Sequence, residues 1–185
     1  MISNNILNIS NGTLVNFVKE FSKKSKDTIA NLENNFLNGT TGYTDETGTK
    51  FEKQKLYVRN YSNEENVVYK VHKNKGHKPI KADDLLTRFC GGIMGDHDTT
   101  LYSYGSRNYE CNIHLGRYLI ELMENMPDIK WPFLMYDLIF RMNNTRKIAI
   151  EYGLTKFSDD KVKEYRNEYD EILKLAKEEN KIFIL

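Results

Sequence analysis

Apolar residues recur at three- and four-residue spacing near the start of the chain. Between positions 11 and 37 they are Leu14, Val15, Phe17, Val18, Phe21, Ile29, Leu32 and Phe36. This spacing is typical of an amphipathic helix. Ser10 or Asn11 can cap its start, and Gly39 stands where a helix prefers a left-handed residue. The pattern predicts one long helix that ends near residue 38.

The next part of the chain favours strands. β-Branched and aromatic residues cluster at 40–44, 55–58 and 67–71, and the clusters are separated by Gly48 and the polar segment 62–66, both suited to reversing the chain. Helical spacing returns at 79–89 behind a proline, and the short apolar run 91–95 leads into Asp96. We therefore expect three antiparallel strands, a helix and a buried fourth strand.

The rest of the chain is mainly helical in pattern. Residues 110–113 suit one more short strand, and the apolar stripe of 115–126 predicts a helix that Pro127 ends. Trp131-Pro132 opens a further helix that Gly153 closes, and Ser158 opens the last one. The predicted fold class is therefore α/β, with a mixed β-β-β-α-β-β sheet, a preceding helix and C-terminal helices.

Composition excludes some classes of protein and leaves others open. Hydrophobic residues make up 39% and charged residues 29% of the 185 residues, which favours a folded globular protein. The formal net charge of +1 provides no overall attraction to nucleic acid, so a DNA-binding surface requires local clusters of Lys and Arg. Two cysteines and no long apolar stretch predict a cytoplasmic protein without a membrane segment.

Two aspartates are the candidates for chemistry. Asp45 lies on the first predicted strand and Asp96 follows the fourth, 51 positions later. Adjacent strands lie only about 5 Å apart, so side chains at matched heights can share a metal ion. Ribonuclease-H-like nucleases bring two carboxylates together in this way. Taken alone, the segment that begins at Asp45 suits a hairpin turn as well, because Asp and Gly are preferred in turns.

The residues around these aspartates carry a resemblance to a known family. The segments are Thr44-Asp45-Glu46-Thr47-Gly48, Gly92-Ile93-Met94-Gly95-Asp96-His97-Asp98 with 99–102, Glu110-Cys111-Asn112-Ile113-His114 with 115–119, the lead-in 10–17 and the late segment 169–173. They closely resemble the catalytic-domain motifs of the IS66 family of bacterial insertion-sequence transposases. The resemblance covers nearly the whole chain.

This resemblance implies a ribonuclease-H-like fold with an Asp-Asp-Glu metal triad that cuts DNA at the element ends and joins them to target DNA. By position, Asp45 is the first carboxylate and Asp96 the second. The implied cofactor is Mg²⁺ or Mn²⁺, with two ions about 3.5–4 Å apart that activate the attacking oxygen and stabilise the leaving oxygen. The implied partners are the double-stranded DNA of insertion-sequence ends and a full-length transposase.

The third acidic residue of the family lies further downstream, in an Asn-Asn-rich motif, and no such motif follows Tyr169-Asp170-Glu171. The apolar tail at 182–185 resembles an interrupted end. We expect an incomplete ribonuclease-H-like sheet, with a helical lead-in at 1–39, the core at 40–126, and a helical insertion at 127–185 that is truncated before the third carboxylate.

The expected function is that of a transposase catalytic-core fragment for DNA strand cleavage and strand transfer, inactive or severely impaired alone. The alternative is a non-catalytic truncated product that binds DNA or a full-length transposase and modulates transposition. A third possibility is that no stable product accumulates, because the apolar tail leaves exposed apolar surface.

Other polar residues have weaker claims. Glu46, His97 and Asp98 either orient the metal ligands or are solvated loop charges. Cys111 and His114 have the spacing of a zinc pair, but one pair cannot close a tetrahedral site. A buried cysteine and a helix-start histidine are favoured instead.

Some residues are candidates for contacts with DNA. His114 and Arg117 lie together in the third motif segment. The one basic cluster extends from His72 to Lys78 and is followed by another lysine. Its candidate phosphate contacts are Lys73, Lys75, Lys78 and Lys81. The alternative for this cluster is a solvated turn.

Overall fold

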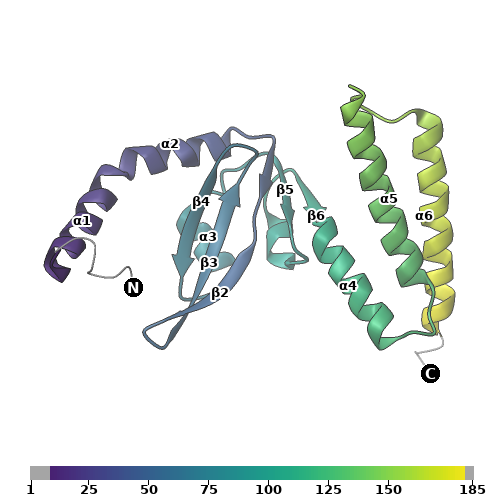
Figure 1. The fold of residues 1–185 in the computed structure, drawn as a ribbon, viewed down its shortest axis with the longest axis horizontal. Coiled ribbons are helices and arrows are strands. Elements are labelled where there is room, and N and C mark those ends of the chain that lie inside the picture. The colour runs from purple at the N-terminus through teal and green to yellow at the C-terminus, as the bar shows by residue number, and fades with distance from the viewer. Residues whose placement is uncertain (1–8, 182–185) are drawn as a thin grey trace. The chain divides into compact units, whose positions relative to one another are not determined.

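The chain folds as two compact units that divide between Tyr109 and Glu110. The computed structural model describes residues 9–181, so the apolar tail at 182–185 lies outside the described residues. We call residues 9–109 the sheet unit and residues 110–181 the helical unit (Figure 1). Together they confirm the predicted mixed α/β class. The predicted limits of a lead-in, a core and an insertion stay predictions.

The lead-in segment forms two helices, α1 (Asn11–Lys24) and α2 (Lys26–Leu37), so the prediction of one long helix is wrong. Both the hydroxyl and the backbone N–H of Ser25 donate to the carbonyl of Phe21. Back-bonding of a serine hydroxyl to the preceding turn tends to bend a helix, which accounts for the break. The Ser10 side chain caps α1 as predicted.

The sheet unit contains six strands. They are β1 (Thr41–Tyr43), β2 (Glu46–Phe51), β3 (Gln54–Ser62), β4 (Val67–His72), β5 (Gly92–Gly95) and β6 (Arg107–Glu110). β1 and β2 pair antiparallel with β3 in a single register, because Tyr43 lies opposite Ser62 and Glu46 lies opposite Arg59. They are therefore one strand path, interrupted at Thr44 and Asp45.

This continuity gives the sheet a simple order. β4 pairs with β3, β3 pairs with both β1 and β2, β1 pairs with β5 in parallel, and β6 follows at the edge. Counting β1 and β2 as one path, the element order is the predicted β-β-β-α-β-β. The mixed parallel and antiparallel sheet is consistent with a ribonuclease-H-like catalytic domain.

The first chain reversal differs from the prediction. Gly48 lies within β2, opposite Tyr57, and the chain turns at Glu52 and Lys53. Both residues have positive φ angles, 47° and 65°, as a two-residue hairpin turn with the twist of its strands requires. The Asn-Gly or Asp-Gly pair that normally signals this turn is absent from these positions. The predicted reversal at 62–66 is confirmed, since β3 ends at Ser62 and β4 begins at Val67.

The core of the sheet unit lies between one sheet face and the adjoining helices. α3 (His77–Asp83) is shorter than the predicted 79–89, because Asp84 adopts a left-handed conformation with φ 55° and ends it. The predicted apolar residues of this segment are nevertheless buried. The core consists of Phe36, Tyr61, Val68, Ile80, Leu85, Leu86, Phe89, Ile93, Leu101 and Tyr104.

The helical unit contains α4 (Asn112–Asn125), α5 (Trp131–Glu151) and α6 (Asp159–Asn180). The predicted strand at 110–113 is displaced to 107–110, because α4 begins at Asn112. The predicted end of α5 is confirmed at Gly153, which has a φ of 73°, and the predicted start of α6 is confirmed at Ser158, whose side chain accepts the N–H of Lys161. The core of the helical unit consists of Leu119, Met135, Leu138, Tyr165 and Ile172.

The start of α5 is fastened to the end of α6. A carboxylate oxygen of Glu179 accepts the backbone N–H groups of Lys130 and Trp131, at 2.9 and 3.0 Å. These are N–H groups that lack partners at the start of a helix. Of the helices at residues 9–181, none has the length and apolar character needed to span a bilayer.

Candidate active site

The register of β1 and β5 places Asp45 and Asp96 at one edge of the sheet. The two strands are parallel, with Tyr43 opposite Met94, and the N–H of Thr44 donates to the Met94 carbonyl at 3.0 Å. Asp45 and Asp96 each lie two residues beyond that pair. Neighbouring strands are about 4.8 Å apart, so two aspartates distant in sequence follow the carboxyl ends of adjacent strands.

The backbone at Asp45 is held by the neighbouring strand. Its N–H donates to the Asn60 side-chain oxygen at 2.6 Å, and the Asn60 N–H donates to the Asp45 carbonyl at 3.1 Å. Asp45 is exposed, and its Oδ1 accepts the N–H of Glu46 at 2.7 Å. Because the strand path continues through Asp45 into β2, the hairpin-turn alternative is wrong for this residue.

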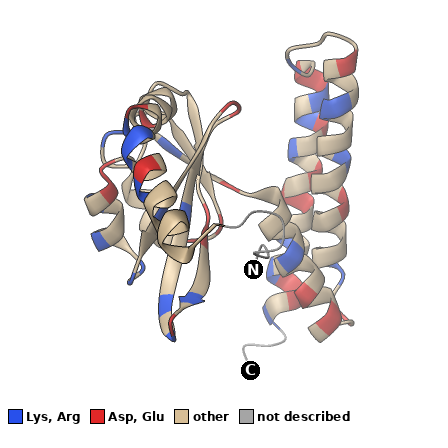
Figure 2. Ribbon diagram, turned by 60° about the vertical axis from the view of Figure 1, so that its left-hand side comes forward, with Lys and Arg blue, Asp and Glu red and all other residues tan. Residues whose placement is uncertain are grey.

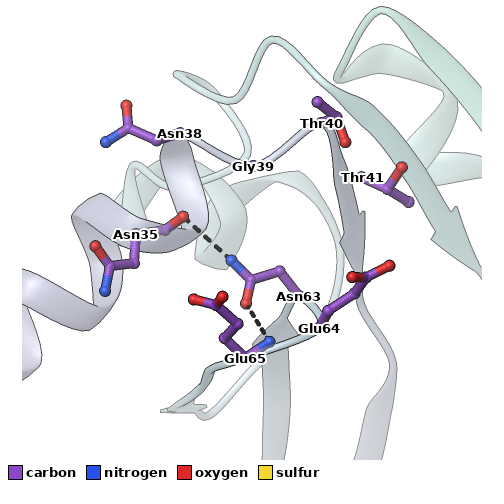
Figure 3. Close-up of a pocket in the computed structure, with 8 residues that line it drawn as sticks. All are labelled: Asn35, Asn38, Gly39, Thr40, Thr41, Asn63, Glu64 and Glu65. Atoms are coloured by element: carbon purple, nitrogen blue, oxygen red, sulfur yellow. Dashed lines mark hydrogen bonds between the residues drawn. The ribbon is translucent and has the colours of Figure 1, made fainter.

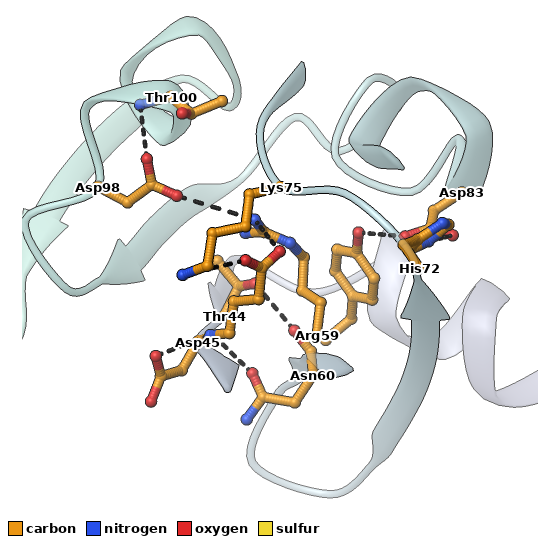
Figure 4. A network of polar contacts seen from close by, with 11 residues as sticks. Thr44, Asp45, Arg59, Asn60, His72, Lys75, Asp83, Asp98 and Thr100 are labelled. Carbon is orange, nitrogen blue, oxygen red and sulfur yellow. Dashed lines mark hydrogen bonds and ion pairs between the residues drawn. The ribbon is translucent and has the colours of Figure 1, made fainter. Parts of the chain in front are cut away.

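A buried arginine connects the two motif segments. Arg59, on β3, is 1% exposed, and its Nη2 lies 2.8 Å from Glu46 Oε2 and 3.7 Å from Asp98 Oδ2. Glu46 Oε1 lies 3.3 Å from the Lys75 ammonium. Figure 4 shows Lys75 and Asp98 beside the Arg59 guanidinium. Sequence reasoning did not single out Arg59, because a lone arginine within a strand pattern gives no signal of burial.

Asp98 has two roles in this network. Besides the contact with Arg59, its Oδ1 accepts the N–H of Thr100 at 2.9 Å and so caps the 3₁₀ helix η1 (Thr99–Ser103). Partial burial raises the pKa of the Asp98 carboxyl, but the hydrogen bonds from Thr100 and the charges of Arg59 and Lys75 outweigh it. Its pKa therefore lies below the ordinary value, and the carboxyl is ionised at neutral pH.

A pocket of about 300 Å³ adjoins these groups. It is lined by Glu46, Lys75, Gly76, Asp96, Asp98 and Thr100. Within residues 9–181, no three His, Cys, Asp or Glu side chains are arranged to hold a metal ion together. Glu46 presents both carboxylate oxygens to cations of the protein itself. Asp45 and Asp96 provide the hard oxygen donors that Mg²⁺ and Mn²⁺ prefer, and two such ligands fit part of a metal site.

A second polar network joins Tyr61, His72 and Asp83. The hydroxyl of Tyr61 donates to Asp83 Oδ2 at 2.6 Å, and His72 Nε2 lies 2.7 Å from Asp83 Oδ1. His72 ends β4 and Asp83 ends α3, so the network joins the two elements on either side of the loop at 73–76. Burial, followed by the hydrogen bond and negative charge of Asp83, raises the pKa of Tyr61 well above its ordinary value.

The raised pKa of Tyr61 predicts a loss of stability at high pH. The contribution is fully present below the ordinary value of 10.0 and is lost as the pH rises toward the folded-state pKa, at up to about 1.4 kcal/mol per pH unit. A Tyr61→Phe variant lacks the ionisable group. Urea unfolding at about pH 9 and about pH 11 should therefore show a larger loss for the wild type than for the variant; equal losses would contradict this.

The four lysines predicted to contact phosphates are all exposed. They are Lys73, Lys75, Lys78 and Lys81. Lys75 also lies over the ring of Tyr57, 5.2 Å from its centroid. In Figure 2, basic and acidic residues are interspersed along α5 and α6. The phosphate contacts stay predictions.

The weaker candidates lie in different places. His97 is exposed, and its Nδ1 is 3.1 Å from the hydroxyl of Tyr102. His114 and Arg117 lie in the first turns of α4, in the helical unit. The Nδ1 of His114 is buried without a hydrogen-bond partner in the described part of the chain. Cys111 precedes α4 and is half-buried, where a buried cysteine was predicted.

A pocket of about 280 Å³ lies at the end of α2 and is lined mainly by asparagines, glutamates and threonines (Figure 3). Its central residue is Asn63, whose Nδ2 donates to the Asn35 carbonyl at 3.1 Å. The Asn63 side-chain oxygen accepts the N–H groups of Glu65 and Asn66, at 3.0 and 2.9 Å. These contacts hold the turn between β3 and β4, which explains the polar residues there.

Comparison with known proteins gives the family of the chain. The family described as "Transposase IS66 family" matches residues 1–181. A search of curated proteins found no match. The family is of the DDE type, whose members generally use divalent metals, and transposases bind DNA. Because the match spans nearly all of the 185 residues, the chain belongs to the IS66 transposase family and contains its DDE catalytic domain.

Proposed function

We propose that Asp45 and Asp96 are the first two carboxylates of the DDE site and bind Mg²⁺ or Mn²⁺. The observation that carries this proposal is the parallel pairing of β1 with β5, which places both residues two positions beyond Tyr43 and Met94. Charge supports it as well. Arg59 and Lys75 balance Glu46 and Asp98 within the adjoining network, so the two aspartates are left to attract a cation.

The proposed reaction is strand cleavage and strand transfer at the double-stranded ends of an insertion sequence. When bound, the divalent metal would activate the attacking water or 3′-hydroxyl and stabilise the leaving oxygen. The chain's own residues position the substrate and the ligands. Asn60 fixes the backbone of Asp45. Four exposed lysines contact phosphates, which positions DNA without reading its sequence; they are Lys73, Lys75, Lys78 and Lys81.

Lys75 has to change partners in this scheme. Its ammonium lies 3.3 Å from Glu46 on the rim of the pocket that Asp96 also lines. A DNA phosphate that approaches Asp96 would compete with Glu46 for the same cation. Because the Lys75 side chain is largely exposed, moving it to a phosphate requires little reorganisation of the core.

We propose that the 185-residue chain binds metal and DNA but transfers strands poorly by itself. Two aspartates can hold one metal ion, whereas a third carboxylate is normally needed to fix a second ion for in-line displacement. Incubation with supercoiled and element-end DNA in Mg²⁺ or Mn²⁺ tests this. Efficient strand transfer by the 185-residue chain would overturn it.

A second candidate function is association with a full-length transposase. The observation that favours it is α1, which buries none of its residues and exposes Leu14, Val15, Phe17, Val18 and Phe21. Contiguous exposed apolar side chains of this kind often mark a protein-binding surface. Size-exclusion chromatography with a full-length relative tests it, since co-elution is required and separate elution contradicts it.

Metal binding provides the direct test of the proposed site. Asp45→Asn and Asp96→Asn should each weaken Mn²⁺ binding by about tenfold or more, since even groups that only orient metal ligands contribute about 10–100-fold. Electron paramagnetic resonance of unbound Mn²⁺ measures the affinity. Asp128→Asn, which removes an exposed charge in the helical unit, is the control. Wild-type affinity in both site variants would show that these aspartates do not hold the metal.

A further inference from the structure

Each acidic motif combines one carboxylate proposed as a metal ligand with one that contacts Arg59. In the first motif, Asp45 is followed directly by Glu46, the first residue of β2. Glu46 contacts Arg59 at 2.8 Å. In the second motif, Asp96 is followed two residues later by Asp98, which lies 3.7 Å from the same nitrogen of Arg59. One guanidinium therefore joins both motifs.

We propose that Arg59 is a positioning residue that fixes Asp45 and Asp96 relative to each other by holding Glu46 and Asp98. This inference rests on the proposed function, because it assumes that the two aspartates bind the metal. The three contacting groups come from β3, β2 and the segment after β5. They therefore connect the carboxyl ends of the two strands from which the proposed ligands extend.

The energetics of Arg59 favour a role at the site over a role in stability alone. Burying a guanidinium is costly, and a buried ion pair often stabilises a fold no better than apolar residues of similar size. The Nε of Arg59 is buried without a hydrogen-bond partner among the described residues, which adds to this cost. An apolar residue would avoid the cost but could not hold two carboxylates.

The chemistry of the side chain suits this task. A guanidinium presents several donors in a rigid plane, whereas an ammonium is a point charge on a flexible stem. Burial confines the guanidinium of Arg59. Its fixed plane in turn fixes the positions of the Glu46 and Asp98 carboxylates. Asp98 is held a second time by the N–H of Thr100. The segment that carries Asp96 is thereby fixed at both β5 and η1.

The test compares Mn²⁺ affinity in folded variants. Arg59→Lys keeps the charge but not the planar geometry, and should weaken Mn²⁺ binding by about 10–100-fold. Asp98→Asn should weaken it by about tenfold, while its amide oxygen can still accept the Thr100 N–H. Circular dichroism of the metal-free proteins should show wild-type secondary structure, which separates positioning from unfolding.

Two controls match these variants. Arg141→Lys alters an exposed arginine that contacts Asp137 and Glu168 in the helical unit. Asp84→Asn removes one negative charge from an exposed position of the sheet unit. Both should bind Mn²⁺ as the wild type does. If Asp84→Asn weakens binding as much as Asp98→Asn, general charge explains the effect and the positioning role is overturned.

The outcomes separate this inference from the proposed function. Folded Arg59→Lys and Asp98→Asn variants with affinities within about twofold of wild type overturn the positioning role, even if Asp45→Asn and Asp96→Asn lose binding. If Arg59→Lys does not fold, Asp98→Asn decides by the same criterion. If the wild type binds Mn²⁺ no better than the Asp45→Asn and Asp96→Asn variants, the proposed function fails and this inference with it.

Discussion

An Arg59→Met substitution is expected to lower the free energy of unfolding by about 3–5 kcal/mol, the usual cost of removing one partner from a buried ion pair. The Glu46 side chain is only 7% exposed, so without Arg59 its carboxylate would be buried beside a thioether. Lys75, on the solvent side, can satisfy one oxygen only. Urea unfolding followed by circular dichroism measures the loss.

A double variant separates the effect of the lost ion pair from the effect of the changed side-chain shape. Combining Arg59→Met with Glu46→Gln also removes the unpaired buried charge. The double variant should recover about half or more of the lost free energy of unfolding, because neighbouring residues are coupled in a mutant cycle. Arg141→Met, which breaks exposed contacts, should cost less than about 1 kcal/mol. Equal stabilities of Arg59→Met and the wild type would show that the buried pair does not contribute to the fold.

A Phe36→Ala substitution is expected to cost about 3–5 kcal/mol, as truncation of a buried aromatic side chain usually does. Phe36 is 1% exposed, and its ring centroid lies 4.8 Å from that of Phe89 and 5.8 Å from that of Tyr61. A Cβ at Gly42 would come within 2.8 Å of the Phe36 ring. The backbone of β1 thus approaches the Phe36 ring closely. Removing this ring leaves a cavity beside the strand that leads to Asp45.

Phe21→Ala is the matched control for this prediction. Phe21 has the same side chain, lies on the preceding helix and is 74% exposed. Its truncation should change the free energy of unfolding by no more than about 0.5 kcal/mol. Thermal and urea unfolding of both variants measure the difference. Similar losses for Phe21→Ala and Phe36→Ala would mean that α1 is packed against other parts of the protein in solution.

Local patterns in the sequence were sufficient for most elements and for the apolar core. Trp131-Pro132 and Gly153 marked the limits of α5, and Ser158 marked the start of α6. Leu85, Leu86 and Phe89 were expected to face the core and do so, although only part of the expected helix forms. The apolar character of these three residues was sufficient to predict their burial, whereas α1 buries none of its apolar residues.

The misplaced boundaries occur where a single backbone conformation decides the result. The break at Ser25, the left-handed Asp84 and the turn at Glu52 and Lys53 have no strong local signal. Glutamate and lysine are unusual residues for positive φ angles, since their Cβ atoms make that region unfavourable. Pairing of the whole β2–β3 hairpin outweighs this local preference.

The sequence by itself determined the family, the mixed α/β class and the two aspartates that are the candidates for metal binding. These depend on residue types at fixed spacing along the chain. Only the tertiary structure decided that Asp45 lies between two strands that pair with β3 in one register, and that Arg59 contacts both acidic motifs. The physical reason is that Arg59, Glu46 and Asp98 meet through strand register and burial, which depend on how distant segments pair.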